Sequence, residues 1–291
     1  MNQLPTPEKP IFYCLLKPFT RACLTLILLH VLFTNVAAQG NLLLMPRRVV
    51  FEGAKKYEEL NLANTGKDTA RYVISLMHIR MKEDGSFEEI TEAGPGENFA
   101  DKYVRFFPHS VVLGPDESQV IKIQLNRTNE LTPGEYRSHI YFRAIPNQAP
   151  LGEQTASVDS TISVKLVPVF GISIPVIIRV GEPEVKITLS DPKVEVAEDT
   201  LHVLNMTFNR TGNVSAYGDL TVDYISPQGK SISAGVIKGI AVYTPNTSRH
   251  FKLNLENHPG INYRSGKLHI TYTTPADTRF AKIAETDIEL H

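Results

Sequence analysis

The sequence predicts an all-β protein made of two β-sandwich domains in tandem, preceded by a cleaved signal peptide. Short segments of alternating apolar and polar residues, separated by turn residues, follow one another from residue 41 onward. The same part of the chain has no long amphipathic helix pattern. The chain has 291 residues, of which 42% are hydrophobic and 21% charged, and this suits one large or two ordinary domains.

The N-terminus has the three parts of a secretory signal peptide. Lys17 and Arg21 precede the apolar run 22–33, and small residues lead to Ala38, after which we expect cleavage. An uncleaved membrane anchor is the alternative, but the run is short and His30 interrupts it. We therefore expect export, with no stable membrane insertion once the signal is removed.

Cysteine use and charge limit what the exported chain can be. Both cysteines, Cys14 and Cys23, lie inside the signal, so the mature chain must gain its stability from core burial rather than from disulfides. The signal holds three of the 30 basic and one of the 31 acidic residues, so 27 and 30 remain after cleavage. This balance gives no indication of a nucleic-acid partner.

About seven strand segments predict a first domain over residues 39–181. Turn or loop residues separate these segments, notably near Gly53, at 64–66, at 83–86, and in the loops 91–101 and 147–157. The segments are 49–51, 57–63, 70–80, the stretch from 104, 120–125, 138–145 and the long run 162–179.

The run 162–179 is the most unusual stretch of the chain. Every even position from Ile162 to Ile178 is apolar, the period of a strand with one buried face. At ~3.3 Å per residue it would span about 60 Å, so we expect Pro168, Gly171 and Pro175 to break or bend it. It is either a buried core strand or a strand that offers its edge to another protein.

A second domain is predicted over residues 182–291, after a joint at 181–183. Its turns lie at 209–213, 227–229, 245–246 and 259–260. Its strand segments are 185–189, 201–209, 220–225, 235–243, 249–255, 266–273 and 283–290.

A short echo links the two domains. A Pro-Gly pair precedes Tyr136 in the first domain and Tyr263 in the second, and each tyrosine leads into a strand. Sandwich folds place a tyrosine near the start of the penultimate strand, where its hydroxyl bonds back to the backbone. We therefore expect both tyrosines to have structural roles.

The motifs of common catalytic and metal sites do not occur. The histidines lack metal-ligand spacing, and neither a nucleophile elbow nor a glycine-rich phosphate loop is found. We therefore expect no enzyme activity, no cofactor and no metal. A carbohydrate-binding sandwich is disfavoured because the chain has no Trp and no identifiable aromatic cluster.

Several ordered motifs resemble the periplasmic pilus-assembly (fimbrial) chaperones. They are Met-Pro-Arg-Arg-Val-Val-Phe-Glu-Gly at 45–53, Leu-Asn-Leu-Ala-Asn at 60–64, Arg-Phe-Phe-Pro-His-Ser-Val-Val-Leu-Gly-Pro at 105–115, Gln-Val-Ile-Lys-Ile at 119–123, and Gly-Glu-Tyr-Arg-Ser-His-Ile-Tyr-Phe-Arg-Ala-Ile-Pro at 134–146. The resemblance implies two immunoglobulin-like β-sandwich domains. It also implies an ATP-independent chaperone of the periplasm that stabilises exported pilus or other surface-fibre subunits.

The resemblance also implies how such a subunit would be held. A pilus subunit lacks its last strand, and the chaperone's seventh strand fills the resulting groove with alternate apolar side chains. By analogy, the donor residues are Phe170, Ile172, Ile174 and Val176. Leu166 and Val164 are second choices, because the register around Pro168 is ambiguous.

The family anchors the subunit's C-terminal carboxylate with an Arg of the first strand and a Lys of the seventh. Arg48 matches the arginine, with an ordinary surface arginine as the alternative reading, and Lys165 is the candidate lysine. The lysine position is open, since Ser173 lies nearest the expected place and Arg179 would substitute only in a different cleft geometry. Pro175 is a further departure, because it removes a backbone donor from the strand.

Two functions of different classes follow from these observations. The first is the strand-donating chaperone, with pilus or surface-fibre subunits as partners and an outer-membrane usher as a further partner in the family. The second is a structural or adhesive envelope protein whose long strand is paired inside its own core. The fate of the strand edge separates them.

Overall fold

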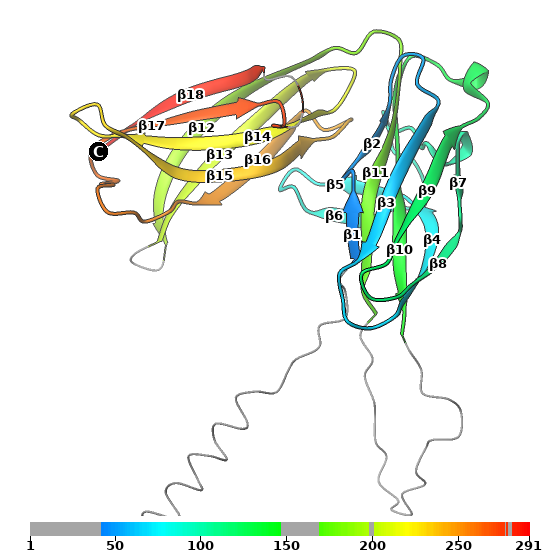
Figure 1. The fold of residues 1–291 in the computed structure, drawn as a ribbon. Coiled ribbons are helices and arrows are strands. Elements are labelled where there is room, and N and C mark those ends of the chain that lie inside the picture. The colour runs from blue at the N-terminus through cyan, green and yellow to red at the C-terminus, as the bar shows by residue number, and fades with distance from the viewer. Residues whose placement is uncertain (1–41, 147–168, 198–200, 277, 279–280) are drawn as a thin grey trace, which may run out of the picture. The chain divides into compact units, whose positions relative to one another are not determined.

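Alternating burial along the strands of the first half of the chain produces two facing sheets. The computed structural model describes residues 42–146, 169–197, 201–276, 278 and 281–291. One sheet has the order β1 (Leu42–Met45), β3 (Tyr57–Asn64), β9 (Ser118–Leu125), β7 (Val104–Phe107). The other has the order β2 (Val49–Phe51), β11 (Gly171–Val180), β10 (Gly134–Ile145), β4 (Ala70–Met77), β8 (Ser110–Leu113). These strands form the first sandwich, and the all-β class predicted from the sequence is confirmed (Figure 1).

The core of the first sandwich is built by the inward positions of both sheets. Leu60 and Leu62 of β3 and Ile121 and Ile123 of β9 are all fully buried, and Phe142 of β10 meets them from the facing sheet. Each of these pairs is separated by one outward residue, as period-two alternation requires. This core holds the strands that carry the candidate site.

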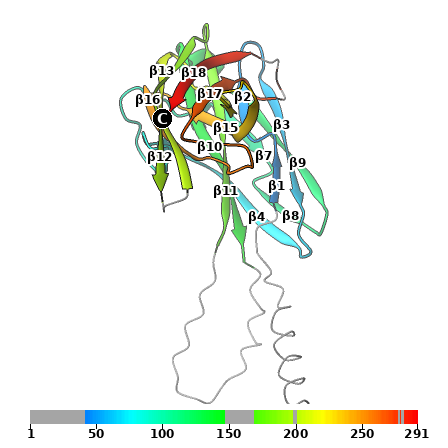
Figure 2. The same ribbon diagram turned by 90° about the vertical axis from the view of Figure 1, so that its left-hand side faces the viewer.

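The chain changes sheets at its beginning, which the sequence analysis did not anticipate. β1 pairs with β3 in one sheet, and β2 then pairs in parallel with β11 in the other, aligning Val49 with Val176 and Phe51 with Ile178. The stretch Leu42–Met45 reads as four apolar residues without visible alternation, although its burial does alternate. Figure 2 shows β4, β10 and β11 together in the sheet that contains β2.

The strand predicted over 70–80 is wrong in extent. β4 ends at Met77, and a separate hairpin of β5 (Ile79–Met81) and β6 (Phe87–Glu89) follows. Its turn is closed by Lys82, whose N–H donates to Ser86 O at 2.8 Å, and Gly85 there has φ +82°. The turn residues were recognisable in the sequence, but the break at residue 78 was not.

The second half of the chain forms another pair of sheets. One has the order β12 (Val185–Ala197), β13 (Leu201–Gly212), β16 (Ser248–Asn254). The other has the order β15 (Ser231–Val242), β14 (Ala216–Ile225), β17 (Gly266–Thr273), β18 (Lys282–Leu290). We call this the second sandwich, and its core contains the buried aromatic residues Phe208, Tyr224 and Tyr272. The seven segments expected from the sequence are present, several of them longer than expected.

Both corner tyrosines have the structural role expected of them. The Tyr136 hydroxyl contacts Thr132, accepting from its backbone N–H at 3.0 Å and donating to its carbonyl at 3.3 Å. The Tyr263 hydroxyl donates to the carbonyl of Glu256, seven residues upstream. Both side chains are buried, so these hydroxyls fix the loops before their strands.

The described residues from Leu42 to His291 belong to one compact unit. The expected signal peptide lies outside the described residues, and the domain limits at 38 and 181 stay predictions. In the part of the chain that the structure describes, no helix has the length and hydropathy to cross a membrane. Among the same residues, no group of three His, Cys, Asp or Glu side chains could hold a metal ion.

We expect Tyr263→Phe to lower the free energy of unfolding by about 1 kcal/mol, because the Glu256 carbonyl loses its donor. Tyr57→Phe is the matched control, since that hydroxyl bonds Glu59 at an exposed site and its loss should cost less than about 0.5 kcal/mol. Urea unfolding followed by tyrosine fluorescence measures both. Equal stabilities of the two variants would contradict the corner role of Tyr263.

Candidate functional site

Strand β11 is paired differently along its two halves. Its whole length, Gly171–Val180, pairs with β10 on one edge. On the other edge, β2 covers only Val176, Ile177 and Ile178. Among the described residues, Gly171–Pro175 has no strand partner on that second edge. Half of the strand is therefore an open edge, the arrangement that can accept a strand from another chain.

The direction of the backbone groups at this open edge follows from one hydrogen bond. The Ala144 N–H donates to Phe170 O at 2.9 Å, so residues 170, 172 and 174 exchange their hydrogen bonds with β10. The N–H groups of Gly171 and Ser173 then point to the open edge. Pro175 occupies the next position of that series and has no N–H, so the donors end where β2 begins.

The side chains predicted to be donors differ in burial on the two sides of Ile172. Ile174 and Val176 are 5% and 0% exposed and belong to the core of their own sandwich, and Ile172 packs against that core. Because these side chains are already enclosed, they are not free to fill a groove in another protein. Phe170 is 49% exposed, so its side chain is free to fill such a groove. Leu166 and Val164, with Lys165, lie outside the described residues.

One odd position of β11 is also buried, for a separate reason. Ile177 is 0% exposed and packs with Met81 of the β5–β6 hairpin and with Ala241 and Tyr243, which come from the second sandwich. The alternation of polar and apolar residues fails at Ile177 because both faces of β11 are covered there.

A pocket of about 290 Å³ lies at the end of the open edge. Ser173 and Pro175 of β11 line it, together with Arg48, which directly precedes β2. The remaining lining residues are Arg47, Ile79, Met81, Phe87, His139, Tyr217, Gly239, Ala241, Tyr243 and Arg249. The lining holds three arginines and neither an aspartate nor a glutamate, so it suits an anion.

Arg48 lies in this pocket with its charge only partly compensated. Its guanidinium carbon is 4.2 Å from the centre of the Tyr217 ring, a cation–π contact. Its Nε is buried without a hydrogen-bond partner. Burial lowers the pKa of Arg48, and nearby Tyr243 opposes that shift. A buried donor without an acceptor is a costly arrangement that a bound carboxylate would relieve.

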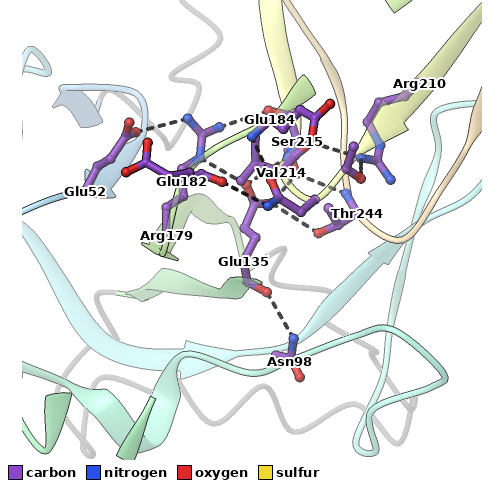
Figure 3. A network of polar contacts seen from close by, with 12 residues as sticks. Glu52, Asn98, Glu135, Arg179, Glu182, Glu184, Arg210, Val214, Ser215 and Thr244 are labelled. Carbon is purple, nitrogen blue, oxygen red and sulfur yellow. Dashed lines mark hydrogen bonds and ion pairs between the residues drawn. The ribbon is translucent and has the colours of Figure 1, made fainter. Parts of the chain in front are cut away.

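Beside the pocket, a polar network encloses Glu135 and Arg179 (Figure 3). The Glu135 side chain is 0% exposed and accepts from Arg179 Nε at 3.2 Å, from the Ser215 N–H at 2.9 Å and from Thr244 Oγ1 at 3.1 Å. The Ser215 hydroxyl also donates to it. Because one buried carboxylate receives all of these donors, it ties β10 and β11 to residues of the second sandwich.

Arg179 is engaged by this network through all of its nitrogen atoms. Besides Glu135, it pairs with Glu52 at 3.2 Å and donates to Ser215 O at 2.9 Å. Arg179 is not among the residues that line the pocket. Ser173, the other candidate, does line the pocket but has no charge. The sequence analysis did not identify Glu135, because no local pattern distinguishes it from the other acidic residues of the chain.

Many of the solved structures that match the chain are fimbrial chaperones, the family that the sequence resembles. The YadV chaperone is 13% identical with a TM-score of 0.43, and the match covers 86% of this chain and all of that one. The E. coli chaperone DraB is 15% identical with a TM-score of 0.40, covering 86% and 96%. A CsuC–CsuE chaperone–tip adhesion subunit pre-assembly complex of Acinetobacter baumannii is 12% identical with a TM-score of 0.39, covering 73% and 90%.

No protein-family model matches the chain, and no curated protein matches it. The names of the three structures are those of chaperones and not of enzymes. Their identities lie below 25% and their TM-scores below 0.5, so the function proposed below rests on this chain's own residues.

The pocket residue His139 should make stability depend on pH. Burial, with Arg137 and His78 nearby, lowers the pKa of His139 to about 3. An unfolded histidine has a pKa near 6.5. Between pH 6.5 and pH 3, His139 therefore binds a proton in the unfolded chain but not in the folded chain. Stability must therefore fall as the pH falls through this window.

Between pH 6.5 and 4.5 we expect protonation of His139 in the unfolded chain to lower the free energy of unfolding by about 2 kcal/mol. Glutamine in His139→Gln cannot take up this proton. Over the same pH range, the free energy of unfolding of the variant should therefore fall by about 2 kcal/mol less than that of the unmodified protein. Urea titrations at several pH values measure both slopes. Parallel slopes in the two proteins would show that His139 is not held neutral by burial.

Proposed function

We propose that this protein is an ATP-independent periplasmic chaperone that binds exported pilus or other surface-fibre subunits by donating a β-strand. The observation that carries the proposal is the half-open strand β11, whose Gly171–Pro175 edge has no partner among the described residues. The exposed Val169 and Phe170 lead into that edge. The proposal places the protein in the periplasm because the N-terminal pattern is that of an export signal.

The closed half of β11 supports this proposal by making the strand rigid. Val176 and Ile178 are buried in the core and lie between β10 and β2. A strand fixed at one end loses little conformational entropy when its other end is paired, and pre-organisation of this kind favours binding. The donated part would comprise the Gly171–Pro175 edge, with Phe170 as the exposed apolar side chain beside it.

The pocket gives the bound strand a direction. It lies where the donors of the open edge end, beside Ser173 and Pro175. A client strand running parallel to β11 along this edge would bring its carboxyl end to the pocket. There Arg48, with a buried and unpartnered Nε, would bind the terminal carboxylate. Client subunits that end in such a strand are therefore the partners proposed, with an outer-membrane usher as a further partner.

The second candidate function is a structural or adhesive envelope protein without chaperone activity. Burial of Ile174 and Val176 in their own core favours it, because this part of the long apolar run serves the protein's own fold. On this reading the open edge is simply the end of a sheet, kept from association by Pro175.

Phe170→Asp separates the two candidates. Ile174 is unsuitable for the test, because a charge there would unfold the sandwich. Phe170 is exposed, so Asp should leave the fold intact and place a charge in the client's apolar groove. We expect the amount of co-expressed client from the same locus in the soluble periplasmic fraction to fall tenfold or more. A tenfold loss of affinity corresponds to ~1.4 kcal/mol of binding free energy.

Val112→Asp is the matched control, since Val112 on β8 is similarly exposed and lies at the other end of the sheet. It should protect clients as well as the unmodified protein does. Full client protection by both variants would exclude strand donation through Phe170 and favour the second candidate.

A further inference from the structure

A tyrosine of the neighbouring strand lies across the open half of β11. Tyr141 of β10 is level with Ser173 of β11, and Arg143 is level with Gly171. Because side chains alternate along a strand, all four residues point away from the core, to what we call the outer face of the sheet. The hydroxyl end of the Tyr141 ring reaches diagonally over Gly171, so a Cβ added to Gly171 would overlap it. Tyr141 therefore takes the place of the side chain that Gly171 lacks.

The glycine at position 171 is required by this close approach and not by the backbone. Its φ lies outside the left-handed region, unlike that of Gly181 just after β11, which is +84°. A glycine weakens a strand and often marks a place where another group comes close. An aromatic side chain packed over a glycine at a sheet edge restores part of the lost stability. This packing accounts for the ring of Tyr141 but not for its hydroxyl.

The Tyr141 hydroxyl has no hydrogen-bond partner among the residues that the structure describes. The hydroxyls of Tyr136, Tyr263 and Tyr272, by contrast, each donate to a backbone carbonyl. A strand added to the open edge would lie ~4.8 Å from β11. On the outer face, the side chain that such a strand places beside Gly171 would begin within reach of the Tyr141 hydroxyl.

The outer face around Tyr141 is basic. Arg71 of β4 and Arg143 of β10 are both exposed there, and Arg143 is the residue level with Gly171. No Asp or Glu occurs in the surrounding stretches of the sheet, which are 71–75, 110–112 and 141–145. A hydroxyl donor and a positive charge are therefore present where a client side chain would lie, and this combination favours a negatively charged hydrogen-bond acceptor.

We propose that Tyr141 is a specificity-determining residue of the open edge, and that its hydroxyl donates a hydrogen bond to an aspartate side chain of the client strand beside Gly171. Aspartate is short, so its carboxylate stays close to the strand and to the hydroxyl lying over Gly171. Aspartate is also depleted in β-strands, so a preference for it would distinguish the client strand from most others. The inference rests on the proposed function, because it requires a client strand at this edge.

A scan with short peptides tests the inference on the mature protein. Nine-residue peptides of alternating valine and threonine carry aspartate at each position in turn, and each is compared with the same peptide carrying leucine there. Binding is followed by nuclear magnetic resonance through the amide signals of Gly171 and Ser173. At one position of the scan we expect aspartate to bind about tenfold more tightly than leucine. Tyr141→Phe keeps the ring but loses the donor, so it should remove most of this preference.

Gly171→Ala should lose the preference as well, although it retains the hydroxyl, because the added Cβ displaces the Tyr141 ring. Since both substitutions remove the same contact, the double variant should lose no more than either one alone. Tyr57→Phe is the matched control, because its hydroxyl lies on β3 of the other sheet, and it should keep the full preference. Thermal unfolding of each variant identifies any that fails to fold.

Two kinds of negative result have different meanings. If the unmodified protein binds leucine as well as aspartate at every position, or if Tyr141→Phe or Gly171→Ala keeps the full preference, the inference is overturned. Strand donation would survive these results, because the peptides still bind at the Gly171 and Ser173 amides. If no peptide binds at these amides, both the inference and strand donation through this edge are overturned.

Discussion

The half-open pairing of β11 is the constraint on which the rest of the molecule depends. From Val176 onward the strand lies between β10 and β2, with Val176 and Ile178 in the core, and before that point one edge has no partner in the described chain. An exposed edge is normally a hazard in a secreted protein, since it invites aggregation. Here Pro175 ends the series of free donors just before the pairing with β2 begins, so the free N–H groups of the open edge are those of Gly171 and Ser173 among the residues described.

Contacts between the two sandwiches fix the closed end of β11. Glu135 and Arg179, on the paired strands β10 and β11, bind Ser215 and Thr244 of the second sandwich, and Ile177 adds apolar contacts with Ala241 and Tyr243. Removing either partner of such a buried pair costs ~3–5 kcal/mol, because the other charge is left uncompensated. The pocket with Arg48 and Arg249 lies beside these contacts. A structural ion pair and an arginine-lined pocket thus occupy neighbouring positions with separate arginines.

The sequence predicted the fold class, most strands and both corner tyrosines, because period-two burial and turn residues are local signals. It missed β1 and joined β4 to β5, where burial is set by partners distant in the chain. Arg48 was found through its neighbours Val49 to Phe51, and the pocket contains it. Alternation predicts Ile174 and Val176 as donors, but alternation alone cannot tell whose core a side chain enters, and both lie in the core of their own sandwich. Glu135 carries no local signal, since its contacts with Ser215 and Thr244 exist only once the two sandwiches are in contact.

Amide hydrogen exchange of β11 tests the central account most directly. In the free protein, the Gly171 and Ser173 amides should exchange quickly, whereas those of Ile172 and Ile174, which bond β10, should be protected. Adding a client subunit should slow exchange at Gly171 and Ser173 selectively. If these two amides are already protected in the free protein, or stay unprotected while a client is bound, β11 is not the strand that is donated.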